Sequence, residues 1–193
     1  MQNEVKNLAN GGLLAIFAHK QTKEMKDNAL SIANYFIDLA NEDKEPIRPL
    51  KLMKLVYIAY GYALALLNRS IIDYRFDKVE AWKFGPVIPS VYHSFKIYGK
   101  KPITEKTTIF VKTKDGYEIE EPNLHDKEAR SICNFVWEKY GQRYSDSQLV
   151  DLMHGKGTPW GQVFVEGENN PIPELYTKLY YTELVRRISD ATK

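Results

Sequence analysis

The fold is decided by residues 49–68, PLKLMKLVYIAYGYALALLN. Pro49 suits the first turn of a helix, and the residues after it are apolar over most of a helical circumference. A helix of this kind normally lies at the centre of its domain. Its longest apolar run, residues 55–67, is shorter than the roughly 20 residues that cross a bilayer, so we expect a buried core helix. Lys51 and Lys54 are expected on a narrow polar strip near its start.

The segment before this helix predicts a second helix that begins at residue 28. Asp27 and Asn28 provide helix-capping chemistry, and apolar residues then recur at spacings of three and four up to Ala40. A polar connection, residues 41–46, follows. Residues 1–27 are polar and weakly patterned, so we interpret them as an N-terminal extension and place the domain at 28–190.

After the central helix the pattern changes to short strands. Residues 76–82 alternate as a strand does, and Lys83-Phe84-Gly85-Pro86 ends it. Pro86 and Pro89 both suit the start of a helix that would stop at Gly99. Residues 107–113 and 117–120 predict a β-hairpin across Asp115-Gly116.

The remaining third of the chain predicts helices. One covers residues 127–140, and Ser145 with Gln148 forms a capping box for a short helix that ends near His154. Thr158-Pro159 could start another short helix through Val163. Pro173 opens a last helix whose expected apolar side comprises Leu175, Leu179, Leu184, Val185 and Ile188. The predicted class is mainly α (α+β), a single compact helical domain with a small β-hairpin or short antiparallel sheet.

The length, net charge and cysteine count of the chain limit the classes of protein to which it can belong. The chain has 193 residues, enough for one domain, and 27 Lys and Arg against 25 Asp and Glu give a net charge of +2. A nucleic-acid partner is therefore unlikely on charge alone. Cys133 is the single cysteine, which excludes an intramolecular disulfide and fits a cytoplasmic protein.

The sequence contains few residues in patterns that are typical of catalytic or metal-binding sites. The chain has one cysteine and four scattered histidines, so no metal site is predicted, and no glycine pattern suggests a phosphate or cofactor site. His154 is the one titratable residue that stands out. It could act as a general base, but we favour a structural role in which it bonds to a backbone carbonyl and fixes the turn before Trp160.

The aromatic block around a Gly-Pro turn is the other distinctive feature. Aromatic side chains there could form a rigid recognition surface or could close a strand onto a helix as core residues. We expect Trp82 in the core, and Lys83 and Phe84 at least partly exposed.

Three stretches carry a resemblance to a known family. They are LMKLVYIAYG at 52–61, EAWKFGPVIPSVY at 80–92, and SQLVDLMH at 147–154 with Thr158-Pro159-Trp160. Together they resemble the Panacea antitoxin domain of SocA-like and phage-associated GepA-like proteins, over about residues 28–180. The resemblance implies an antitoxin, encoded beside a toxin, that neutralises it by direct protein contact. Some members of the family act instead as adapters that deliver the toxin to a protease.

We therefore predict a non-enzymatic, cytoplasmic antitoxin without cofactors or a membrane segment. Its partner is a cognate toxin encoded nearby; a cytosolic protease and a homo-oligomer are further possible partners. The alternatives are a proteolytic adapter, a His154-dependent enzyme and a DNA-binding regulator that uses Lys51, Lys54, Lys100 and Lys101. The expected partner-binding residues are Lys83, Phe84, Tyr92 and Lys54, and the motif residues with a structural role are Trp82, Gly85, Pro86, His154 and Trp160.

Overall fold

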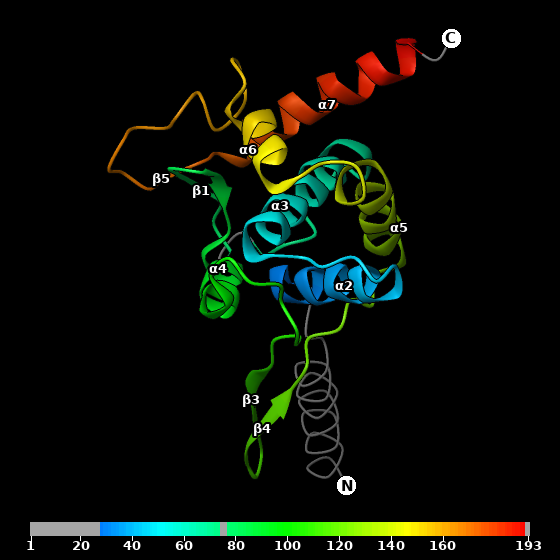
Figure 1. The fold of residues 1–193 in the computed structure, drawn as a ribbon, viewed down its shortest axis with the longest axis vertical. Helices are drawn as coiled ribbons and strands as arrows, with labels where there is room; N and C mark the ends of the chain where they lie inside the picture. The colour runs from blue at the N-terminus through cyan, green and yellow to red at the C-terminus, as the bar shows by residue number, and fades with distance from the viewer. Residues whose placement is uncertain (1–27, 74–76, 192–193) are drawn as a thin grey trace, which may run out of the picture.

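The central element of the computed structural model, which describes residues 28–73 and 77–191, is helix α3 (Pro49–Leu66). Helices α2 (Ala29–Glu42), α5 (Lys127–Val136) and α7 (Glu174–Ala191) pack around it (Figure 1). Fourteen of the 18 residues of α3 are buried, which confirms the predicted core helix. Asn28 caps α2 as predicted, because its side chain accepts hydrogen bonds from the amides of Leu30 and Ser31.

A small antiparallel sheet lies beside this helical body. Strand β1 (Glu80–Trp82) is its centre and pairs with β2 (Gly85–Val87) on one side and β5 (Asn170–Pro171) on the other. Because Pro86 pairs with β1 as part of β2, the helix start predicted there is wrong. Helix α4 (Pro89–Phe95) begins at Pro89 and continues as the 3-10 turn η1 (Lys96–Tyr98). The two-residue β5 was not predicted, since so short a strand leaves no alternation.

The predicted β-hairpin is confirmed as β3 (Ile109–Thr113) and β4 (Gly116–Glu120). It projects from the helical body on the side of α2 (Figure 1). Its base is held by Asn34, a buried residue of α2 whose side chain donates to the carbonyls of Thr107 and Pro122 and accepts from the Thr107 amide. Lys106 adds ion pairs to Asp38 and Glu121.

The segment from α5 to Val163 differs from its prediction in two places. Helix α5 ends in a π-helical turn (η2, Trp137–Gly141), and α6 (Asp146–His154) begins with the predicted capping box at Ser145. The short helix expected over 158–163 is a series of turns. The Thr158 hydroxyl donates to the Met153 carbonyl and accepts from the Gly161 amide, which stabilises the turn instead.

Of the five residues predicted for the apolar side of α7, Leu184 and Val185 are half-buried and pack against the core. Thr177 and Tyr181 are buried, whereas Leu175, Leu179 and Ile188 are exposed, so the predicted apolar side is wrong at those three positions. The reason is a close approach to Gly61, where a Cβ atom would lie 2.2 Å from the Tyr181 ring. The C-terminal end of α7 extends beyond the body (Figure 1).

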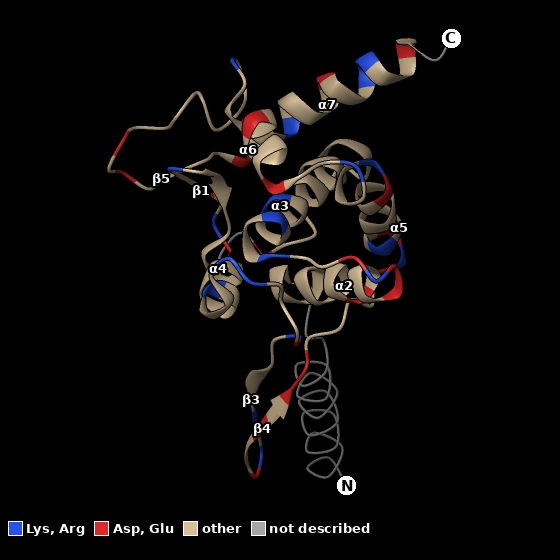
Figure 2. Ribbon diagram, in the orientation of Figure 1, with Lys and Arg blue, Asp and Glu red and all other residues tan. Residues whose placement is uncertain are grey.

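The observed class, mainly α with small antiparallel sheets, agrees with the prediction. None of the helices in the described ranges is both long and apolar enough for a membrane span. Lys and Arg are scattered over the body together with Asp and Glu, as Figure 2 shows.

Candidate partner-binding site

Three chain segments meet beside the start of α3 and bring the motif residues into one cluster. The segments are α3 itself, the turn between β1 and β2, and the region from the end of α6 to Trp160. We call this group, Lys54, Trp82, Gly85, Pro86, His154 and Trp160, the motif cluster.

Lys54 is fully buried, so its predicted place on an exposed polar strip is wrong. Because α3 is surrounded on nearly all sides, its lysine side chain has nowhere to reach solvent. The Nζ atom donates a hydrogen bond to the Pro86 carbonyl at 2.9 Å. Burial, which penalises the charged form, lowers the pKa of Lys54 to about 7. Lys54 therefore supports the Gly85-Pro86 turn from inside and offers no surface for a partner.

Gly85 is required by the closeness of this lysine. Its φ of +99° lies in the left-handed region that favours glycine. A Cβ atom at Gly85 would lie 2.9 Å from Lys54 Nζ and 3.3 Å from Met153 Cβ. The turn thus packs directly on α3 and α6.

Trp82, a half-buried member of the cluster, packs against Tyr92 of α4, which is also half-buried. Their rings meet edge to face with centroids 4.7 Å apart, and the Trp82 indole donates to a Glu80 carboxylate oxygen at 2.7 Å. Both side chains pack against the core while remaining partly accessible. The expected core position of Trp82 is therefore only partly realised, and Tyr92 presents one side to solvent.

His154 and Trp160 stack with nearly parallel rings whose centroids are 3.9 Å apart, and Trp160 stacks in turn on Phe164. The Trp160 indole donates to the Trp82 carbonyl at 2.8 Å, which joins this stack to β1. His154 Nε2 is buried and has no hydrogen-bond partner among the described residues. The expected bond from His154 to a carbonyl is absent there, so the imidazole acts by stacking.

The environment of His154 disfavours its charged form. Burial is the main cause that lowers its pKa, the charge of Lys54 adds to it, and Asp151 opposes it. Within the described ranges, no group of three or more His, Cys, Asp or Glu side chains could hold a metal ion.

The outer side of the turn opens onto a groove. Lys83 and Phe84 are exposed, as predicted, and 59% of Phe84 is accessible. The groove has a volume of about 690 Å³ and runs between the starts of α3 and α6. We call it the Phe84 groove; it is lined by Glu45, Pro46, Arg48, Leu50, Lys51, Phe84, Ser145, Asp146, Ser147, Val150 and Asp151.

Charged groups of both signs border the Phe84 groove. Arg48 stands at the start of α3 without a side-chain cap for that helix, so the α3 N-terminus adds partial positive charge. Burial lowers the pKa of Lys51, while Asp146 and Glu45 oppose that shift. The groove is thus lined by both apolar and charged side chains, a mixture that is common in protein interfaces.

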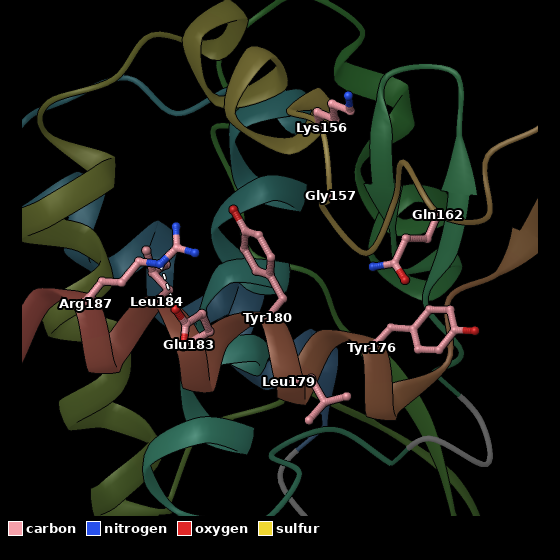
Figure 3. A pocket seen from close by; sticks show the side chains of 9 residues that line it. All are labelled: Lys156, Gly157, Gln162, Tyr176, Leu179, Tyr180, Glu183, Leu184 and Arg187. Atoms are coloured by element: carbon pink, nitrogen blue, oxygen red, sulfur yellow. Dashed lines mark hydrogen bonds and ion pairs between the residues drawn. The ribbon is translucent and has the colours of Figure 1, made fainter.

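A second groove lies between α7 and the loop after α6. It has a volume of about 430 Å³, and the side chains of Tyr180 and Gln162 extend into it (Figure 3). Glu183 and Arg187 close one end with an ion pair at 2.8 Å. This groove was not predicted from the sequence, because its existence depends on which face of α7 packs on α3.

Comparison with known proteins identifies a family model and a relative that match this chain. A family model described as "Antitoxin SocA-like, Panacea domain" matches residues 52–161. Antitoxin SocA of Caulobacter vibrioides (strain NA1000 / CB15N) is 36% identical over 133 residues, which cover 69% of this chain and 68% of that protein. No solved structure matches the chain. The matched range contains the whole motif cluster.

Proposed function

The chain belongs to the SocA-like antitoxin family with the Panacea domain, and we propose that it neutralises a toxin protein by binding it directly. We further propose that residues 28–190 form the functional unit and that residues 1–27, which lie outside the described ranges, form an extension to it. The toxin is the product of a neighbouring gene. Neutralisation requires no catalysis by this chain.

The observation that carries the proposal is the exposed Phe84 on a rigid turn at the mouth of a groove. A large aromatic side chain normally loses its accessibility on folding, whereas 59% of this one remains accessible. The hydrogen bond from Lys54 to Pro86 holds the turn in place before any partner arrives. Little conformational entropy is then lost on binding, which favours affinity.

The partner contacts in this proposal are Phe84 as the apolar anchor, with Lys83 and the accessible side of Tyr92 next to it. Aromatic anchors commonly dominate the binding energy of an interface. The charges of Arg48 and Asp146 beside the groove would select the orientation of the toxin rather than supply most of the affinity.

The first experiment is co-expression with the product of the adjacent gene, followed by growth measurement and affinity pull-down. The wild type should restore growth and form a stable complex. Phe84→Ala should weaken the complex by roughly tenfold or more while leaving the unfolding temperature unchanged. Leu175→Ala is the matched control, because Leu175 is also 59% exposed but lies outside the Phe84 groove. Equal binding by both variants would remove Phe84 from the interface.

Further measurements on the same co-expression system, together with a DNA-binding assay, separate the alternative functions. An adapter would lower the toxin level, and the level would recover when the host protease is deleted. A His154-dependent enzyme would lose protection in a folded His154→Ala variant, whereas direct binding predicts that protection persists. A DNA-binding regulator would show DNA affinity that falls steeply with salt. Rescue of growth with unchanged toxin level and a stable complex supports direct binding.

A further inference from the structure

The projecting hairpin carries an apolar face that nothing in the described structure covers. Phe110 of β3 lies directly opposite Ile119 of β4, and Lys112 lies opposite Tyr117. Residues that are directly opposite share a face of the ribbon, so three large apolar side chains lie together. Their exposed fractions are 75% for Phe110, 71% for Tyr117 and 68% for Ile119. Apolar groupings of this kind on a protein surface commonly mark interaction sites.

The outer edge of β4 is also open. Among the described strands only β3 pairs with β4, and all five residues of β4 are exposed. On β3, by contrast, Ile109, Val111 and Thr113 are half-buried. A strand edge with free amide and carbonyl groups can pair with a strand of another chain. The hairpin base is fixed by Asn34, so this edge is presented in one orientation.

Charge distinguishes the two faces of β4. Tyr117 and Ile119 point to one face, and Glu118 and Glu120 point to the other. Neither Glu118 nor Glu120 takes part in an ion pair within the described ranges. The neighbouring Lys106 forms its ion pairs with Glu121 and Asp38 instead. A strand added to β4 would therefore meet apolar side chains on one face and two uncompensated carboxylates on the other.

We propose that the outer edge of β4 is a docking site for an extended segment of a partner protein in which basic and apolar residues alternate. The backbone of that segment would extend the ribbon to three strands. Its apolar side chains would lie beside Tyr117 and Ile119, and its Lys or Arg side chains beside Glu118 and Glu120. Strand addition obtains affinity from main-chain hydrogen bonds and specificity from alternate side chains. The outer edge of β4 shares no residue with the Phe84 groove, so the inference does not rest on that groove.

The test uses the full chain and three synthetic eight-residue peptides. The first alternates Lys and Val, the second has four Lys followed by four Val, and the third alternates Glu and Val. We expect the Lys–Val alternating peptide to bind roughly tenfold tighter than either of the others. Hydrogen exchange should slow at the amides of β4 and remain unchanged in α3.

A charge-reversed variant gives the matched control. Glu118→Lys with Glu120→Lys should reverse the preference, so that the Glu–Val alternating peptide binds best. Both side chains are exposed, and an unchanged unfolding temperature would show that the fold is retained. Equal binding of the alternating and block Lys–Val peptides would show that charge attraction alone explains the binding, which would contradict strand addition. No binding of any peptide, or the same preference in the variant, would overturn the proposal.

Discussion

The side-chain nitrogen of Lys54 lies 2.9 Å from the carbonyl oxygen of Pro86, which it reaches from the buried side of the β1–β2 turn. Since burial lowers the pKa of this lysine from 10.5 to about 7, the bond couples the turn to pH. Lys54 is the only lysine with no exposed surface among the described residues.

Lys54 should make the folded state more stable as pH rises from about 7 towards 9. In that range the unfolded chain keeps the lysine proton and the folded chain has lost it, so raising the pH favours folding. The effect is at most about 1.4 kcal/mol for each pH unit. Urea unfolding of the wild type and of Lys54→Met at pH 7, 8 and 9 measures it. Equal slopes for the two proteins would show that Lys54 titrates normally.

His154 should make the folded state less stable as pH falls below about 6.5. Its pKa is lowered by burial and then by Lys54, so below its usual pKa the unfolded chain binds the proton more readily. His154→Phe keeps a ring to stack on Trp160 and lacks the titration. The free energy of unfolding should decline less between pH 6.5 and 5.5 in this variant. A decline as steep as that of the wild type would assign it to the carboxylates instead.

Gly85→Ala should destabilise the fold more than Gly157→Ala. Both glycines have positive φ, at +99° and +84°, so each alanine costs roughly 1 kcal/mol of backbone strain. At Gly85 the added methyl group also meets Lys54 Nζ at 2.9 Å, whereas nothing lies within 4 Å at Gly157. Thermal unfolding of the two variants compares them directly. Equal losses would mean that the lysine moves aside without cost.

Asn34→Ala should loosen the hairpin before it loosens the helices. The change removes three hydrogen bonds and leaves the buried carbonyl of Pro122 and the partly buried backbone groups of Thr107 unpaired, at a cost of roughly 2 kcal/mol or more. Hydrogen exchange should accelerate in β3 and β4 more than in α3. Asn34→Asp is the control, because it keeps the acceptor for the Thr107 amide and loses both donors. Uniform acceleration over the whole chain would contradict a local role.

The sequence predicted those parts of the fold that depend on local patterns. The apolar circumference of α3, the caps at Asn28 and Ser145, and the turn chemistry before Gly116 all act within a few residues. The sequence did not predict the parts of the fold that depend on packing between residues far apart in the chain. The face of α7 is chosen by the fit of Tyr181 over Gly61, and β5 exists only because β1 lies beside it.

The same distinction holds for the site. The exposure of Phe84 follows from its position on a tight turn, so it was predictable. The burial of Lys54 was not, because a lysine near the start of a helix usually reaches solvent along its aliphatic chain. Its position depends on two distant segments, the β1–β2 turn and the end of α6, closing over α3. The stack of His154 on Trp160 likewise requires a turn, stabilised by Thr158, that was predicted as a helix.

The packing of α7 on α3 has a consequence for synthesis. The Tyr57 and Thr177 hydroxyls lie 3.3 Å apart although 120 residues separate them in the chain. The ribosome therefore completes α3 long before the helix that covers it emerges, and the apolar surface around Gly61 stays open during that interval. A nascent chain interrupted before α7 exposes this surface to chaperones and proteases. Supply of the complete, folded protein is thus sensitive to any stress that interrupts translation.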